Sequence, residues 1–142
     1  MLVAIGSDHA GVAYKAAILN LLNELGHTVR DFGTDSEEAV DYPDYIRPVA
    51  QAVAKGEFER GIIFGGSGNG EQMVANKVRG IRCALCWNTT TARLARQHND
   101  ANMVSIGERV TGLEEVRDLV RIFLDTEFEG GRHQRRIDKI ES

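Results

Sequence analysis

The sequence predicts a three-layer α/β/α sandwich built on a five-stranded parallel sheet. Short apolar runs alternate with helical patterns along the whole chain of 142 residues. Such alternation is typical of right-handed β-α-β units, which place helices on both faces of a sheet. The length fits one domain, residues 1–142, and no repeat or linker interrupts it. We expect a flavodoxin- or Rossmann-like α/β fold with the strand order 2-1-3-4-5.

Five short apolar runs are the expected strands. Each is bounded by glycine or polar residues, as buried parallel strands usually are. They are Leu2–Ile5, Thr28–Phe32, Gly61–Phe64, Ile81–Trp87 and Asn102–Ile106.

Six segments between and after these runs have helical patterns. In the first, Ala13, Ala16, Ala17 and Leu21 recur at helical spacing, and Gly26 closes the helix. In the second, Pro48 either lies in the first turn or kinks the helix. The expected segments are Val12–Glu24, a part of Pro43–Lys55, Gly70–Val78, a helix capped by the turn Asn88–Thr91 and ending at His98, and helices near Leu113–Thr126 and Gly131–Ile140.

Composition and charge exclude several classes of protein. The net charge of −4 argues against a nucleic-acid partner, and no apolar run approaches the roughly 20 residues of a membrane helix. No signal peptide is visible at the N-terminus. Cys83 and Cys86 have the spacing of a redox or half-zinc motif, but we favour two core residues on opposite faces of a strand. Without a disulfide framework, the cytoplasm is the expected compartment.

The third strand runs into a loop with four glycines in six residues, Gly65–Gly70. Such a loop lets backbone N–H groups converge on an anion at a helix N-terminus. It lacks the Gly-Lys-Ser/Thr of a P-loop and the glycine spacing of the dinucleotide fingerprint. Asn69 stands where a nucleophile elbow needs glycine, so Ser67 is a poor hydrolase nucleophile. We favour an anion-binding loop over a purely structural turn.

Ligands of such sheets bind at the C-terminal ends of strands. The loops to consider therefore follow the first, third and fourth strands: Gly6–Gly11, Gly65–Glu71 and the segment reaching His98. Glu71 is either an acid that complements the helix dipole or a general base beside oriented N–H donors. His98 is either a surface residue or a proton donor at a helix C-terminus. Asp8 and His9 are further candidates at this edge.

The main positive cluster lies near the C-terminus, in Arg132–Arg136. Arg132 and Arg136 are four residues apart, so a helix presents both on one face. Two adjacent guanidinium groups suit a phosphate dianion. The alternative is a solvated basic face that pairs with Asp138 and Glu141.

Taken together, these motifs resemble the ribose-5-phosphate isomerase type B family, which is grouped with the bacterial galactose-6-phosphate isomerase subunits. The resemblance spans essentially the whole chain. It rests on Gly6-Ser7-Asp8-His9-Ala10-Gly11, Asp41-Tyr42-Pro43, Gly65–Lys77, Arg96-Gln97-His98-Asn99, and Gly131-Arg132-His133 with Arg136.

The resemblance implies interconversion of ribose 5-phosphate and ribulose 5-phosphate through an enediolate. One branch of the family uses a cysteine as base at the position of Gly65. This chain is similar to the other branch, with Gly-Gly-Ser-Gly-Asn-Gly-Glu, which assigns the base to Glu71.

The resemblance also implies the roles of the remaining residues. His98 would open the sugar ring, and Asp8 would position hydroxyl groups. The loop would hold the enediolate oxygen through its backbone N–H groups, and Ser67 would be one of the catalytic residues. The phosphate would bind His9, Arg132 and Arg136, with Asn99 and Arg109 completing the site. The loop residues are Gly66, Ser67, Gly68, Asn69 and Gly70.

Other implications concern cofactors and partners. No cofactor or metal is expected, and the sequence shows no cluster of His, Cys and Asp at ligand spacing. The family resemblance implies a homodimer or homotetramer with a shared active site, and the C-terminal helices are expected at the interface. Two alternatives stay open: an isomerase of a hexose 6-phosphate such as allose or galactose 6-phosphate, and a module that binds a phosphosugar without converting it.

Overall fold

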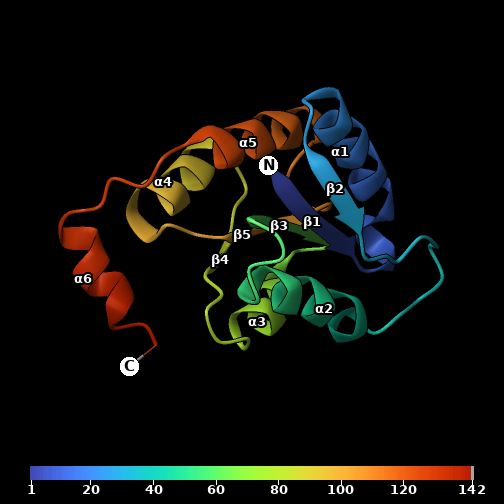
Figure 1. Cartoon of the computed structure of the whole chain (residues 1–142). Helices are drawn as coiled ribbons and strands as arrows, with labels where there is room; N and C mark the ends of the chain where they lie inside the picture. The colour runs from blue at the N-terminus through green and yellow to red at the C-terminus, as the bar shows by residue number, and fades with distance from the viewer. Residues whose placement is uncertain (142) are drawn as a thin grey trace.

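The computed structural model describes residues 1–141 and contains one five-stranded parallel sheet between two layers of helices (Figure 1). The expected fold class is confirmed. The strands are β1 (Leu2–Ser7), β2 (Thr28–Asp31), β3 (Arg60–Gly65), β4 (Cys83–Leu85) and β5 (Met103–Gly107).

The order of the strands is β2-β1-β3-β5-β4, so the predicted order 2-1-3-4-5 is wrong for the last two. Burial explains the exchange. All five residues of β5 are buried, as a strand inside the sheet requires, whereas β4 is three residues long and only partly buried. The short strand therefore takes the edge, where one side of its backbone has no partner strand.

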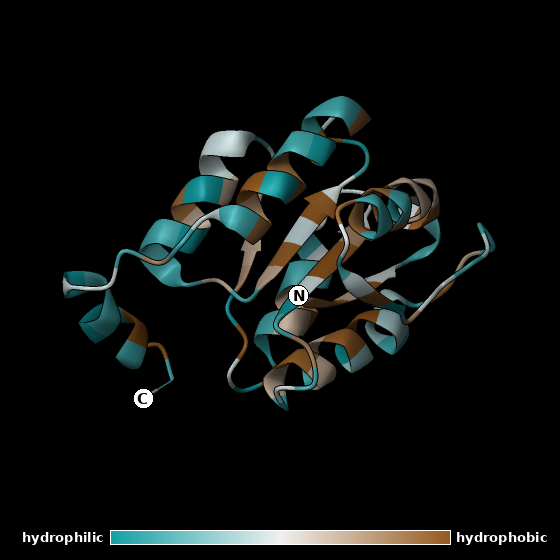
Figure 2. Ribbon diagram, turned by 45° about the horizontal axis from the view of Figure 1, so that its top comes forward, coloured by the Kyte–Doolittle hydropathy of each residue, from teal (hydrophilic) through white to brown (hydrophobic). Residues whose placement is uncertain are grey.

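The helices that follow are α1 (Val12–Glu24), α2 (Tyr42–Ala54), α3 (Asn69–Asn76), α4 (Thr89–Asn99), α5 (Leu113–Asp125) and α6 (Arg132–Asp138), with a short 3-10 turn η1 (His9–Gly11) before α1. Two hydrophobic clusters divide them between the faces of the sheet. Residues of α1, α4 and α5 form the larger cluster, and residues of α2 and α3 form the other. Figure 2 shows the apolar stripes of these helices.

Alternate residues of each strand feed the two clusters, as the pleat of a strand demands. On β3, Ile62 and Phe64 face the larger cluster and Ile63 faces the smaller. Cys86 lies in the larger cluster and Cys83 in the smaller, which confirms that they point to opposite faces. Both thiols are free, and burial raises the pKa of each. They are core residues.

The local sequence correctly predicts the bounds of α1 and the cap of α4, but not most of the residues that α1 buries. The expected bounds of α1 are confirmed, and Asn88 caps α4 through a capping box with Thr91. Of the four apolar residues expected to recur on α1, only Leu21 is buried, and its buried neighbours are Lys15, Ile18 and Leu22 rather than the three alanines. Lys15 is buried because its ammonium group donates to Asp31, Asp35 and the Thr34 carbonyl. Alanines carry too little apolar surface to orient a helix against these partners.

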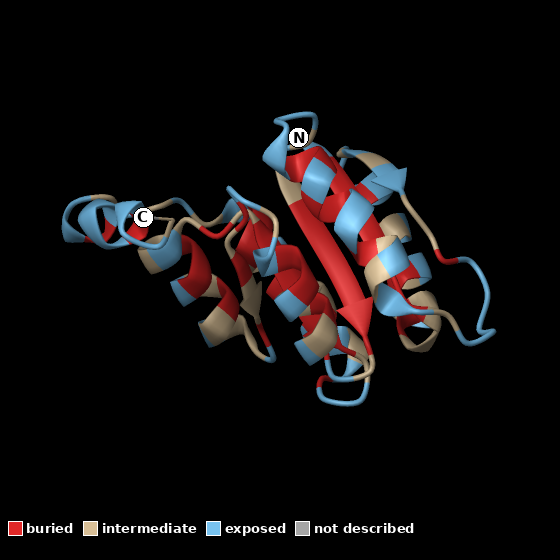
Figure 3. Ribbon diagram, turned by 90° about the horizontal axis from the view of Figure 1, so that it is seen from below, coloured by how far each residue is buried: buried red, intermediate tan, exposed pale blue. Residues whose placement is uncertain are grey.

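The helix α6 stands apart from the sandwich. Figure 3 shows it as a largely exposed element at one end of the molecule. Its buried residues are His133 and Ile137, and its contacts are made mainly with α4. A membrane crossing would need a longer and more apolar helix than any found among residues 1–141.

Candidate active site

The glycine loop is a rigid platform at the C-terminal end of β3. The N–H groups of Glu108 and Arg109 donate to the carbonyls of Gly65 and Gly66 at 2.8 and 2.9 Å. The Ser105 hydroxyl, completely buried, donates to the Gly68 carbonyl at 2.8 Å. The loop is thus fastened to the end of β5, the strand paired with β3.

Gly68 gives the loop its shape. Its φ of 84° lies in the left-handed region, which favours glycine, and it directly precedes the first turn of α3. In the described part of the chain, the N–H groups of Gly66, Ser67 and Gly68 donate to no protein acceptor, while the Asn69 N–H donates to the Ser67 hydroxyl at 3.2 Å. Donors without a partner next to a helix N-terminus form a site for an anionic oxygen.

Glu71 lies in the first turn of α3 and is buried, with 4% of its surface exposed. Its carboxylate covers the Cα of Gly65, and a side chain at that position would overlap it. Burial is the main cause that raises the pKa of Glu71 to about 7, followed by a hydrogen bond with Asp8 and the charge of Asp8. A carboxylate that only complemented the helix dipole would be solvated and would keep a low pKa. This one can accept and return a proton near neutral pH.

Asp8 and His9 reach the same place from the end of β1. Asp8 accepts hydrogen bonds from the N–H groups of Ala10 and Gly11, at 2.9 and 3.2 Å, so its side chain is fixed. Nδ1 of His9 accepts from the Val40 N–H at 3.1 Å, which leaves Nε2 as the available ring nitrogen.

Arg109 and Tyr42 border the loop on two sides. A Cβ placed on Gly66 would lie 3.4 Å from the Arg109 guanidinium carbon. One placed on Gly70 would lie 2.6 Å from the Tyr42 ring, so Gly70 has to be glycine for the ring to pack there. The half-site therefore contains Asp8, His9, Gly65–Glu71, Arg109 and Tyr42.

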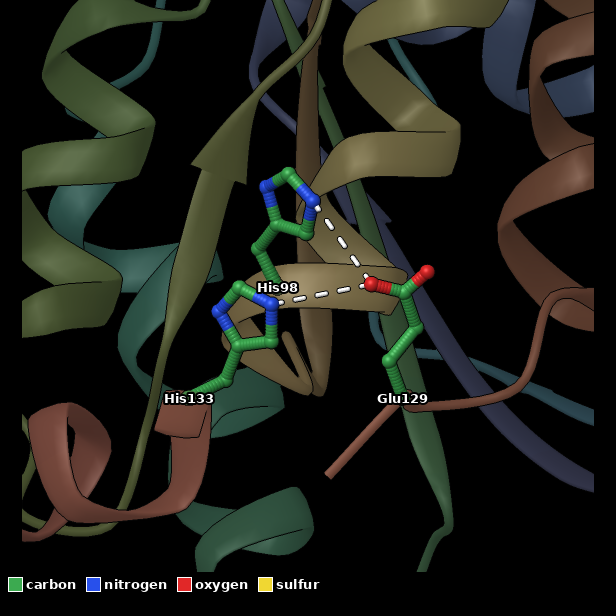
Figure 4. A group of neighbouring side chains, drawn as sticks. All are labelled: His98, Glu129 and His133. Atoms are coloured by element: carbon green, nitrogen blue, oxygen red, sulfur yellow. Dashed lines mark ion pairs between the residues drawn. The ribbon is translucent and has the colours of Figure 1, made fainter. Parts of the chain in front are cut away.

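The other predicted residues lie on α4 and α6. His98 and Asn99 end α4, and Arg132 and Arg136 are exposed on α6. The rings of His98 and His133 stack with centroids 4.5 Å apart, and Glu129 lies beside both (Figure 4). Asp138 accepts from Gln134, and Glu141 lies 3.8 Å from Arg79, so neither pairs with these arginines in the part of the chain described. A solvated basic face paired with Asp138 and Glu141 is therefore not what the structure contains.

The glycine-loop residues and the residues of α4 and α6 lie at opposite ends of the parallel strands. Gly65 is paired with Gly107 at the end of β5, whereas His98 precedes Met103, where β5 begins. The eleven residues of α4 carry the chain back over the sheet by about 16 Å. Within one chain, the segment reaching His98 therefore does not join the glycine loop. In Figure 1, α6 lies on the side of the molecule away from the arrowheads of β1 and β2.

Three contacting residues were absent from the predicted site. Tyr42 belongs to a quoted motif, but nothing local shows that it packs on Gly70. Glu129 and His133 have the i, i+4 spacing of a pair on one helical turn, and they meet His98 only because α6 packs on α4. The absence of a ligand-spaced cluster, inferred from sequence, is thus corrected: His98, Glu129 and His133 form one.

Comparisons with known proteins give one consistent result. The sequence model of the family described as Ribose/Galactose Isomerase matches residues 3–140. The chain is 46% identical to ribose-5-phosphate isomerase B of Escherichia coli (strain K12), covering 97% of this chain and 93% of that protein. The structure of Clostridium thermocellum ribose-5-phosphate isomerase B superposes with a TM-score of 0.98 at 50% identity, over 99% of this chain and 95% of the other. The Mycoplasma genitalium enzyme with bound ribulose-5-phosphate gives a TM-score of 0.95 at 42% identity, over 98% and 93%.

Proposed function

Because this chain belongs to the ribose/galactose isomerase family, and is an isomerase, we propose that it interconverts ribose 5-phosphate and ribulose 5-phosphate through an enediolate. One observation carries the proposal. The buried Glu71 carboxylate, with its pKa raised to about 7, lies beside the N–H groups of Gly66, Ser67 and Gly68, which have no protein acceptor in the described chain. This is the pairing of base and oxyanion donors that enolisation requires.

Glu71 is the base in this mechanism. In the open-chain aldose it removes the proton on C2 and returns it to C1, while the hydroxyl proton of O2 passes to O1, so one carboxylate serves both carbon steps. The developing charge on the sugar oxygen is stabilised by the N–H groups of Gly66–Gly70, with Ser67 bordering the same position. Asp8, held by two backbone N–H groups, positions the sugar hydroxyls. Neither proton transfer needs a cofactor.

The Gly65–Glu71 contact supports the assignment to the glutamate branch. The carboxylate occupies the space directly over the Gly65 Cα. A cysteine at position 65 and the present placement of Glu71 would exclude each other, because both need the same volume. The cysteine base of one branch and the glutamate base of the other would therefore lie at the same point in the site.

A second copy of the chain completes the site. Four expected site residues lie at the end of the sheet opposite the glycine loop and cannot reach Glu71 of their own chain. They are His98, the ring-opening acid, and the substrate and phosphate ligands Asn99, Arg132 and Arg136. We propose a homodimer or homotetramer in which α4 and α6 of one copy meet the glycine loop of another. His9 and Arg109 then approach the phosphate from the loop side. Buried free thiols fit a reducing compartment, the cytoplasm.

The test is a turnover assay with ribose 5-phosphate beside allose 6-phosphate and galactose 6-phosphate. We expect the highest kcat/KM with ribose 5-phosphate. A higher value with either hexose phosphate would transfer the assignment to that substrate, and binding of all three without turnover would identify a phosphosugar-binding module.

A further inference from the structure

A cluster of three side chains, His98, Glu129 and His133, contains two residues that the isomerase mechanism leaves unused. Nε2 of His133 lies 3.6 Å from Oε1 of Glu129, and Nε2 of His98 lies 3.8 Å from the same oxygen. One ligand atom from each residue falls within 4.8 Å of the others. Figure 4 shows both imidazole rings turned toward the carboxylate.

The buried histidine gives an independent indication of a ligand. The His133 side chain is 7% exposed, and its Nε2 is a buried polar atom with no hydrogen-bond partner. A buried polar atom without a partner costs stability unless something else binds it.

We propose that His98, Glu129 and His133 form an inhibitory binding site for a divalent transition metal of the zinc class. Two imidazoles and one carboxylate, with an open fourth position for water, are a common zinc ligand set. Imidazole nitrogens favour zinc, copper and nickel over magnesium or calcium.

The observed distances are close to those of a bound metal. Bonds of about 2.0–2.2 Å place tetrahedral ligand atoms about 3.3 Å apart, and two of the pairs lie at 3.6 and 3.8 Å. The stacked rings do not yet aim at one point, so one ring has to turn. His98, with 41% of its side chain exposed, has room for this, and Glu129 is half exposed. The charges of Arg132 and Arg136 oppose the metal, and the Glu129 carboxylate offsets them.

Binding of zinc would stop turnover, because it occupies the His98 nitrogen assigned to ring opening. This consequence rests on the proposed function, whereas metal binding itself does not. The two parts can therefore fail separately.

The binding test uses the untagged full-length protein, freed of metal and titrated with zinc chloride by calorimetry. We expect one zinc per chain. His133→Gln should raise Kd by more than about 100-fold, since even outer-shell partners cost about 10–100-fold, and Glu129→Gln by at least tenfold. Glu127→Gln, an exposed acid two residues away, is the matched control and should leave Kd unchanged.

Cobalt(II) in place of zinc should give the intense visible absorption of a tetrahedral site. No binding, or equal binding by Glu129→Gln, would overturn the proposal.

The activity test measures turnover of ribose 5-phosphate with and without zinc. Glu129→Gln should keep turnover within about fivefold, because an exposed ion pair contributes little, and should lose its sensitivity to zinc. A chelator should restore the wild type. Zinc that binds in calorimetry without inhibiting would refute the inhibitory role and contradict His98 as the ring-opening residue, while Glu71 would remain the base.

Discussion

The glycine-loop region and the α6 region differ in how firmly the chain holds them. The loop is fixed by Glu108, Arg109 and Ser105, and its carboxylate is buried. In contrast, α6 contacts mainly α4, and its arginines are exposed. The first region is built within one chain, whereas the arginines of the second pair with no acidic side chain among residues 1–141.

The difference separates the chemistry from the capture of substrate. A base that must meet a weakly acidic C–H proton needs a preformed geometry, because small displacements cost large factors in rate. Guanidinium groups bind a phosphate through charge and paired N–H donors, and they take no part in the proton transfer itself. We therefore expect changes in the loop region to lower kcat, and changes in the α6 region to act through the second copy.

The largest effect should come from Glu71→Gln. The amide keeps the size of the side chain but cannot accept the proton, so kcat should fall by about 10³-fold or more while KM changes little. Steady-state kinetics with ribose 5-phosphate measures both. The control is Glu115→Gln, an exposed acid on α5. Near-normal turnover in Glu71→Gln would remove the base from the proposed mechanism.

Mixing two inactive variants tests whether the regions belong to different chains. Glu71→Gln and His98→Gln, co-expressed with different tags, should each be nearly inactive alone, since general acid–base groups contribute about 10²–10⁴-fold. Hybrid dimers contain one site with both residues intact, so a random mixture should recover about a quarter of wild-type turnover.

The control for this mixture is Glu71→Gln with Glu71→Ala. Both chains then lack the same group, and no hybrid has an intact site. Recovery in this control, or none in the first mixture, would show that the sites are not shared as proposed.

Much of the fold could be predicted from the sequence because its signals are local. The strand-helix alternation, the bounds of α1 and the capping of α4 by Asn88 depend on residues within a few positions. The exchange of β4 and β5 could not be read in this way, because parallel neighbours are chosen by burial across the whole sheet.

The candidate site was predicted as a set of residues but not as an arrangement. Asp8, the glycine loop and Glu71 follow strand ends that share one edge, so their proximity follows from the topology. His98 was placed with them because α4 starts at that edge, although a helix carries its own C-terminus to the other one. The His133 contact depends on how α6 packs on α4, which no local pattern specifies.

A substitution of Gly65 should break the loop region without changing a charge. In Gly65→Ala the three nearest atoms to the new Cβ all belong to the Glu71 carboxyl group, which has to move. A displaced base should cost about 100-fold in kcat. The matched control is Gly112→Ala, where a Cβ meets nothing within 4 Å.

A double variant shows whether this loss acts through Glu71. Gly65→Ala added to Glu71→Gln should cost little further, because the base is already gone. Additive losses would mean that Gly65 acts through something other than the carboxylate, such as the position of the loop donors.

The smallest effect should appear in the free energy of unfolding, which the buried, ionised Glu71 carboxylate lowers. The pKa of Glu71 moves from its ordinary value of 4.5 to about 7 on folding, so the folded state binds the proton more tightly. Its contribution is fully present below pH 4.5 and is lost as the pH rises through about 7. At about 1.4 kcal/mol for each pKa unit, the loss is at most about 3 kcal/mol.

Glu71→Gln has no such titration, so its free energy of unfolding relative to wild type should increase between pH 5 and pH 8 by up to about that amount. Urea unfolding at a fixed protein concentration measures this difference, with Glu115→Gln as the control that should show none. A difference that stays constant with pH would mean that Glu71 ionises as readily in the folded chain as in the unfolded one, and the loop region would lose the property that makes it suited to move a proton near neutral pH.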